Sequence, residues 1–199
     1  MTKYTISKES QHHEKIVDSR FFGYVFPAKN RENVDRILTK IKKEHPKATH
    51  ICWACRYLNE SNGQIEYYFS DAGEPTGTAG KPILKAIENK NIINVMCVVV
   101  RYFGGTKLGR GGLVRAYGGT ATKTIEKAEI IPYEKTVHLK FRSSYKLYPM
   151  LEKFLRNTSI AFETTYNNDN VIFNIPSLPE SRLDEVKNKV IQLGCTLIK

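Results

Sequence analysis

The feature that most restricts the fold of this chain is an apolar run followed by a glycine-rich loop and a long helix-like segment. Residues 95–100 read VMCVVV, which is the length and composition of a buried strand. Five glycines follow within the nine positions 104–112, and the next segment predicts a helix that ends near Ala128. A strand that runs through a flexible backbone into a helix indicates a fold that mixes α and β structure.

The residues before this segment predict further strands and helices. Residues 12–27 are rich in β-branched and aromatic side chains and predict extended structure. Asn30 precedes apolar residues at helical spacing, which predicts a helix to about Glu44. The remaining predictions are a strand at 48–58, a turn at Asn62-Gly63, a strand at 65–70, a helix at 78–89 and a strand at 92–101.

After Glu129 the pattern starts again and predicts a second domain. Strands are expected at 131–141, 159–165, 171–175 and 195–198, and helices at 145–157 and from Pro179 to Gly194. The order βαββαβ is that of a ferredoxin-like domain. We therefore expect an α+β protein with domains at 1–130 and 131–199.

The charge of the chain is strongly positive, with 31 Lys and Arg against 20 Asp and Glu and a formal net charge of +11. Residues 1–130 carry +8 of that excess, so the first domain is the expected site of contact with an anionic partner. No apolar run approaches the length of a membrane helix, and the N-terminal residues lack the apolar core of a signal peptide. We expect a soluble cytoplasmic protein.

The four cysteines are Cys52, Cys55, Cys97 and Cys195. Cys52 and Cys55 form a CxxC with His50 just before it, but no second ligand pair has the spacing of a zinc site. The segment also predicts a strand, in which residues three apart point to opposite faces. Reduced core cysteines are the favoured interpretation and metal or redox use is the alternative, so we expect no metal site and no cofactor.

The second glycine-rich loop, residues 101–117, is the main candidate for a binding site. Arg101, Lys107, Arg110 and Arg115 bring four positive charges with no acid between them, while Tyr102, Phe103 and Tyr117 add aromatic rings. Cations and stacking faces on a glycine-rich backbone suit phosphate or single-stranded nucleic acid. The sequence resembles a Walker A loop but lacks its lysine and its hydroxyl residue, which excludes that chemistry. The predicted binding residues are Arg101, Tyr102, Phe103, Gly104, Gly105, Lys107, Gly109, Arg110 and Arg115. The alternative is that the glycines allow close helix packing and the arginines form a solvated face.

The first glycine-rich loop, residues 71–82, joins a strand to a helix for which Thr78 is the expected N-cap. Helix N-termini bind anions, but Asp71 and Glu74 add negative charge that opposes one. Those carboxylates are expected to cap N–H groups, to pair with arginines or to hold a cation; a plain strand-to-helix turn is the alternative. The candidate residues here are Asp71, Gly73, Glu74, Thr76, Thr78 and Gly80.

The segments YYFSDAGEPTGTAGKPIL and VVVRYFGGTKLGRGGLVRAYGG resemble the two signature segments of the Impact family, also called the YigZ family. ATHICWACRY resembles a third block, with His50 at the position of its histidine. The resemblance implies that the first domain is similar to domain IV of elongation factor G and to GHMP kinases. It implies that the second domain is similar to domain V of elongation factor G. The eukaryotic member regulates translation partly through an additional domain that this chain lacks.

Three functions are compatible with these observations. The favoured one is binding to RNA or the ribosome with a role in regulation of translation, because the first domain is basic and carries the cationic loop. The second is a binder of a small phosphorylated ligand, or an enzyme of unknown reaction, that uses the two loops as one site. The third is a protein-interaction module. Catalytic residues are not identified by any motif in the chain.

Overall fold

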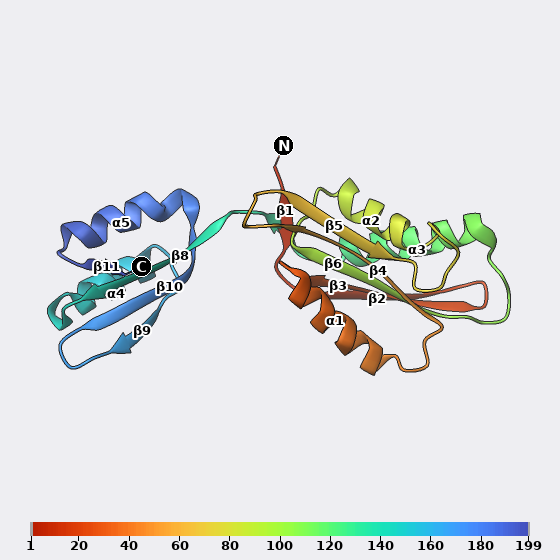
Figure 1. The fold of residues 1–199 in the computed structure, drawn as a ribbon, viewed down its shortest axis with the longest axis horizontal. Helices are drawn as coiled ribbons and strands as arrows, with labels where there is room; N and C mark the ends of the chain where they lie inside the picture. Colours follow the sequence, from red (N-terminus) through yellow and green to blue (C-terminus); the bar gives the residue numbers. More distant parts are fainter. Residues whose placement is uncertain (1, 199) are drawn as a thin grey trace. The chain divides into compact units, whose positions relative to one another are not determined.

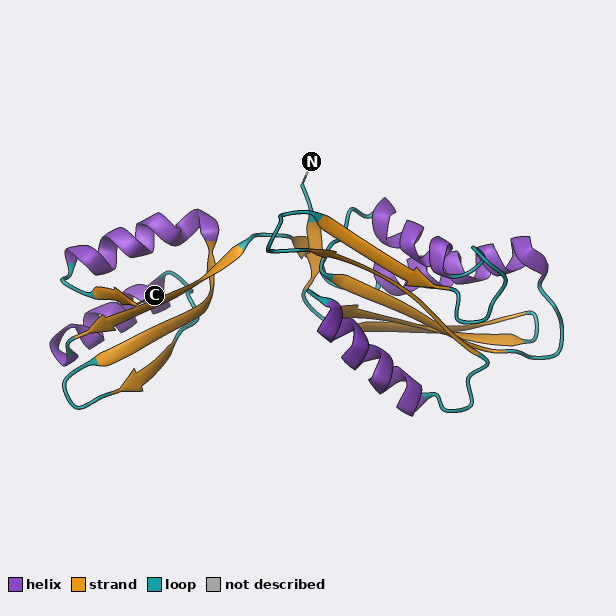
Figure 2. Cartoon of the chain, in the orientation of Figure 1, coloured by secondary structure: helices purple, strands orange, loops and turns teal. Residues whose placement is uncertain are grey.

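The computed structural model describes residues 2–198, and the chain divides into two compact units, residues 1–133 (unit 1) and 134–199 (unit 2). Each unit contains its own sheet and its own apolar core (Figure 1). Mixed α+β structure with antiparallel sheets is present in both units, as the sequence predicts (Figure 2).

Unit 1 is built around a five-stranded antiparallel sheet with the order β2-β3-β6-β4-β5. Its strands are β2 (Ser10–Ile16), β3 (Ser19–Pro27), β4 (His50–Leu58), β5 (Ile65–Ser70) and β6 (Val95–Tyr102). A separate pair joins β1 (Tyr4–Ile6) to β7 (Ile130–Pro132). The central strand β6 is the predicted VMCVVV strand, and residues 95–100 are all buried.

Helices cover both faces of this sheet (Figure 1). Helix α1 (Arg31–Glu44) packs Val34, Ile37 and Ile41 on one face. Helices α2 (Gly80–Asn89) and α3 (Gly109–Glu126) pack on the other face. Because strand side chains alternate, Cys52 belongs to the core under α2 and α3 and Cys55 to the core under α1.

Unit 2 has the order βαββαβ and a four-stranded antiparallel sheet, β11-β8-β10-β9. This is the ferredoxin-like arrangement that the sequence predicts. Its elements are β8 (Thr136–Ser143), α4 (Tyr148–Asn157), β9 (Glu163–Tyr166), β10 (Val171–Pro179), α5 (Leu183–Gln192) and β11 (Thr196–Ile198). Short 3-10 turns precede the helices, at Tyr145–Leu147 and Glu180–Arg182. Phe141 and Phe173 stack at the centre of its core, with ring centroids 5.0 Å apart.

Several boundaries differ from those predicted. The extended segment 12–27 is a hairpin, because Val17 adopts a φ of 54° and the chain reverses before Ser19. The expected strand 131–141 is two strands, β7 and β8, whose partners lie in different sheets. The strand expected at 159–165 begins only at Glu163.

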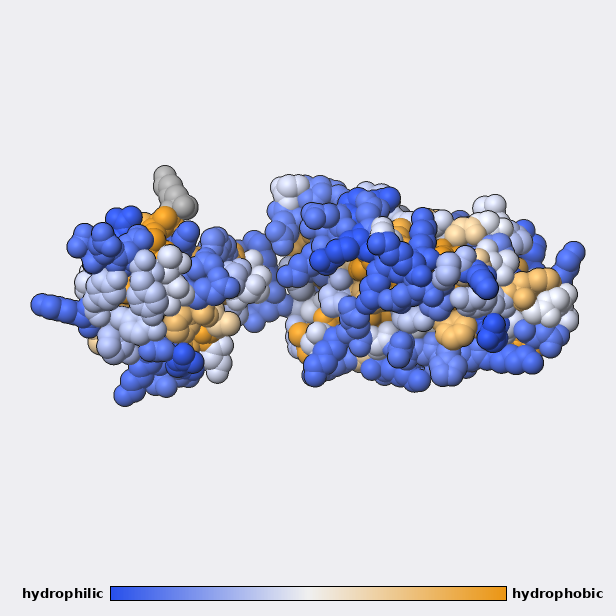
Figure 3. Space-filling view, turned by 90° about the horizontal axis from the view of Figure 1, so that it is seen from below, coloured by the Kyte–Doolittle hydropathy of each residue, from blue (hydrophilic) through white to orange (hydrophobic). Residues whose placement is uncertain are grey.

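The face seen in Figure 3 is mainly hydrophilic, with separate apolar patches between hydrophilic side chains. Helix α1 contributes exposed cations, namely Arg36, Lys40, Lys42 and Lys43. Within residues 2–198, no helix combines the length and the apolar character needed to cross a bilayer.

Candidate functional site

The two glycine-rich loops lie at one end of unit 1 (Figure 1). Residues of both loops line a cleft with a volume of about 430 Å³. This volume lies in the range of small-ligand sites. The first loop leads from β5 into α2, and the second leads from β6 into α3. The cleft is lined by Thr49, His50, Glu74, Pro75, Arg101, Phe103, Lys107, Leu108, Gly109, Arg110 and Leu113.

A buried ion pair joins the loops at the floor of the cleft. Arg101 Nη1 donates to Glu74 Oε1 at 2.7 Å, and the two side chains are only 5% and 3% exposed. Tyr117 Oη donates to the same oxygen at 2.7 Å, and the Arg101 guanidinium also donates to Ser19 Oγ. Burial raises the pKa of Tyr117, so its hydroxyl stays protonated as a donor. Of the three roles expected for the carboxylates of the first loop, Glu74 has the second: it pairs with an arginine.

His50 stands beside this pair, on β4. Its Nδ1 lies 2.9 Å from the carbonyl oxygen of Ala72, which can only accept, so Nδ1 carries a proton. In the neutral ring Nε2 is therefore an acceptor; it lies 3.8 Å from Glu74 Oε1. His50 was noted in the sequence only through the CxxC and the family block, and its position at the cleft depends on the pairing of β4 with β6.

Asp71 closes the N-terminus of α2 instead of facing the cleft. Its carboxylate accepts from the backbone N–H groups of Gly77, Ala79 and Gly80 at 2.8–3.0 Å. Burial opposes ionisation of Asp71, but the hydrogen bonds from these N–H groups outweigh it and lower the pKa. The prediction of Thr78 as N-cap is wrong, because its hydroxyl donates to the Pro75 carbonyl at 2.6 Å and Asp71 supplies the cap.

The four cations of the second loop have different environments. Arg101 is neutralised by Glu74, as described above. Lys107, Arg110 and Arg115 are exposed, and no acidic side chain among residues 2–198 pairs with them. Arg110 Nη2 donates to the Thr76 carbonyl at 2.9 Å, which is a second link between the loops. Lys107 and Arg110 line the cleft, whereas Arg115, five residues further along α3, is not among the lining residues.

The three aromatic residues of the second loop also separate. Phe103 lines the cleft and is 43% exposed, with the Arg101 guanidinium 5.2 Å from its centroid. Tyr102 points to the opposite face of the sheet, where its hydroxyl meets His45 Nδ1 at 2.9 Å. Tyr117 is completely buried. Only Phe103 of the three therefore presents a ring to the cleft.

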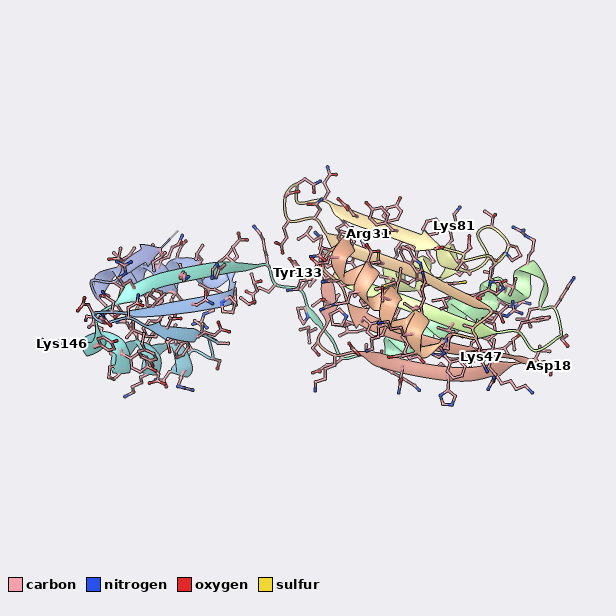
Figure 4. All side chains as sticks on the ribbon, turned by 60° about the horizontal axis from the view of Figure 1, so that its bottom comes forward. Asp18, Arg31, Lys47, Lys81, Tyr133 and Lys146 are labelled. Atoms are coloured by element: carbon pink, nitrogen blue, oxygen red, sulfur yellow. The ribbon has the colours of Figure 1, made fainter. Side chains whose placement is uncertain are left out.

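The glycines of the loops serve backbone geometry. A Cβ at Gly104 would lie 1.8 Å from the carbonyl oxygen of Asp18, so the second loop packs directly on the β2–β3 turn. Figure 4 labels Asp18 at this end of unit 1. Gly109 has a φ of 70° where the loop enters α3. The other predicted glycines, Gly73, Gly80 and Gly105, lie in the same loops, and Gly80 packs against Ser70.

The cysteines next to this site are not poised to react. Burial raises the pKa of the Cys52 thiol to about 12 and that of Cys55 to about 11. Cys52 Sγ donates to the Asp71 carbonyl at 3.0 Å. Both are free thiols in separate cores. The CxxC is therefore a strand with two core cysteines.

The structure thus brings together six of the predicted residues at the cleft and adds five that the loop motifs did not identify. Those predicted are Glu74, Arg101, Phe103, Lys107, Gly109 and Arg110. The five added are Thr49, His50, Pro75, Leu108 and Leu113. Pro75, Leu108 and Leu113 lie within the two loop segments. The sequence did not identify them as binding residues because proline is common in turns and leucine in cores.

Comparisons with known proteins agree on one family. A family model described as the Impact N-terminal domain matches residues 17–125. An IMPACT family member from Haemophilus influenzae is 40% identical over 139 residues, which are 69% of this chain and 67% of the relative. IMPACT family member YvyE from Bacillus subtilis is 32% identical over 171 residues, 85% of this chain and 77% of the relative. A solved structure of a hypothetical protein is 26% identical, covers 100% of this chain and 98% of its own, and has a TM-score of 0.68.

Proposed function

The chain belongs to the Impact family, and from that premise we propose that it is a cytoplasmic protein that binds RNA or the ribosome and acts in the regulation of translation. The contact surface is the cleft and its cationic rim. The family resemblance supports the role in translation. The charges of the cleft support the class of partner.

The observation that carries this proposal is the contrast between paired and unpaired cations on one loop. Glu74 neutralises Arg101 in the interior, whereas Lys107, Arg110 and Arg115 are exposed without an acidic partner among the described residues. Exposed like charges on a short segment repel one another, so the folded state gains nothing from holding them together. Phosphate groups at this rim would remove that repulsion and release counterions.

The first turn of α3 supports the same partner. Its N-terminus has no side-chain cap and no acidic residue. Gly109 and Arg110 begin the helix at the edge of the cleft, where the unpaired N–H groups favour an anion. Lys107, two residues before the helix begins, adds an exposed positive charge.

The test measures binding of a single-stranded RNA to the full chain at several salt concentrations. The triple substitution of Lys107, Arg110 and Arg115 by Ala should weaken binding at low salt and reduce the slope of log K against log salt by about 2, since each phosphate contact on single strands contributes about 0.7. A matched control replaces Lys8, Lys90 and Arg31, which pair with acids elsewhere on unit 1, and removes the same net charge. Equal effects of the two triples would place RNA elsewhere on the surface.

A second candidate function is favoured by the floor of the cleft. His50, Glu74 and Arg101 lie within a few ångströms of one another and line a cleft whose volume suits a small molecule. A phosphorylated metabolite would place its phosphate on Lys107 and Arg110 and its polar body on His50. Thermal-shift measurements with nucleotides and phosphorylated metabolites test this candidate, and a null result with all of them excludes it.

A further inference from the structure

The walls of the cleft differ in character from its rim and its floor. Phe103, Leu108, Leu113 and Pro75 form largely apolar walls. The rim carries Lys107 and Arg110, and the floor carries the Glu74 carboxylate and His50. Contact with phosphates alone would need only the rim, so the apolar walls indicate a ligand with a flat or apolar part between two polar ends.

Phe103 is held in a position suited to stacking. Its backbone N–H donates to Thr49 Oγ1 at 3.0 Å, which ties the loop to the end of β4. The Arg101 guanidinium is 5.2 Å from the Phe103 centroid and 5.6 Å from that of Phe21, so it contacts both rings. Phe103 nevertheless remains 43% exposed. A ring supported by a buried cation and still open to solvent can stack with a planar group.

The floor of the cleft carries two groups with hydrogen-bond acceptor atoms, His50 and Glu74. His50 Nε2 carries a lone pair in the neutral ring, because Nδ1 donates to Ala72. The Glu74 carboxylate, paired with Arg101, lies beside it, with Oε1 3.8 Å from His50 Nε2. A nucleobase edge with N–H donors complements these acceptors.

We propose that the cleft takes one unpaired nucleotide of a single-stranded RNA, with its base between Phe103 and the Leu108–Leu113 wall and its phosphates on Lys107 and Arg110. This inference rests on the proposed function and specifies how the RNA is held. The base edge faces His50 and Glu74. The binding mode is that of single-stranded nucleic acid recognition, in which aromatic rings stack bases and cations follow the backbone.

The experiment combines a protein change with an RNA change. Phe103→Ala should weaken binding of a short single-stranded RNA by about 5- to 100-fold, the effect of losing one base–aromatic stack. Phe103→Trp should restore it. One abasic nucleotide, moved along the RNA, should cause a similar loss at the position that occupies the cleft. At that position Phe103→Ala should cause no further loss, since the stacked base is already absent.

Tyr67→Ala is the matched control, because Tyr67 is a 56% exposed aromatic residue on the edge strand β5. It should bind every RNA as the unchanged protein does. Because Phe103 is itself exposed, Phe103→Ala should fold normally, which a thermal melt checks.

The possible outcomes separate this inference from the proposed function. If Phe103→Ala and every abasic position leave affinity unchanged while Lys107→Ala and Arg110→Ala reduce it, RNA binds at the rim only and the base does not enter the cleft. If the fold-losses of affinity from Phe103→Ala and from the abasic nucleotide multiply at every position of the RNA, the two changes act independently and no base stacks on Phe103. If the unchanged protein binds no RNA, the proposed function fails and this inference fails with it.

Discussion

The guanidinium of Arg101 and the carboxylate of Glu74 are joined at 2.7 Å in the interior of unit 1, where the side chains are 5% and 3% exposed. Arg101 ends the buried part of β6, and Glu74 lies in the loop between β5 and α2. The pair therefore holds the two glycine-rich loops together. Tyr117, from α3, donates to the same oxygen and adds the third element.

Glu74→Gln should lower the free energy of unfolding by about 3 kcal/mol, because it leaves the Arg101 guanidinium buried without a countercharge. Urea unfolding at pH 7 measures the loss. Combining it with Arg101→Met should recover part of the stability, since the unpaired charge is removed. Glu152→Gln is the control; its partner Arg156 is 69% exposed, so its loss should stay below about 1 kcal/mol. Equal losses in both variants would contradict a central role for the buried pair.

Asp71→Asn should cost about 1–2 kcal/mol at pH 7, because the carboxylate accepts from the N–H groups of Ala79 and Gly80 at the start of α2 and from that of Gly77 in the preceding loop. The pKa of Asp71 is lower in the folded chain than its ordinary value of 3.8, so its stabilisation is complete above that pH. It is lost as the pH falls through the folded pKa. The difference between the two proteins should thus shrink below about pH 4 in urea unfolding measured against pH. A difference that stays constant down to pH 2 would show that the charge of Asp71 is not responsible.

Gly104→Ala should destabilise unit 1 and displace the second loop, because the new Cβ would meet the Asp18 carbonyl oxygen at 1.8 Å. We expect a loss of about 2–4 kcal/mol. Gly119→Ala is the matched control within α3, since nothing lies within 4 Å of its added Cβ. That variant should gain about 0.5–1 kcal/mol from helix propensity. Thermal unfolding compares the two, and similar melting temperatures would contradict the close packing on Asp18.

The thiols of Cys52, Cys55 and Cys97 should not react with a thiol reagent in the folded protein at pH 7.5. All three are buried, and burial raises the pKa of Cys52 and Cys97 to about 12 and that of Cys55 to about 11. Addition of guanidinium chloride should unfold the protein and expose the three thiols to rapid labelling. With an aromatic disulfide as the reagent, labelling is followed by the absorbance of the aromatic thiolate that it releases. Rapid labelling of folded Cys52 would revive the interpretation of the CxxC as a redox site.

Most secondary structure could be predicted because it depends on local periodicity. The run at Val95–Val100, the apolar spacing of α1 and the βαββαβ order of unit 2 are all patterns within short windows. The hairpin of β2 and β3 is not evident from the sequence, because β-branched Val17 adopts the positive φ of its turn, where glycine or asparagine is the usual signal. The cap of α2 was assigned to Thr78, since a capping residue is sought next to its helix, whereas Asp71 reaches it from eight or nine positions away.

The sequence by itself determined the α+β class, the two loops and the family, because strand and helix periodicity and the long glycine-rich segments are local properties of the chain. Only the tertiary structure decided how the charges of the loops are used. The pairing of β6 with β4 places Arg101 opposite His50. The packing of α2 and α3 on one face of the sheet brings Glu74 to the Arg101 guanidinium and brings the Tyr117 hydroxyl to the same Glu74 oxygen. The sequence does not distinguish the four cations of the second loop. In the folded chain Arg101 is buried and paired with Glu74, whereas the other three cations face solvent. The reason is that a charge in the interior requires a partner and a charge in water does not.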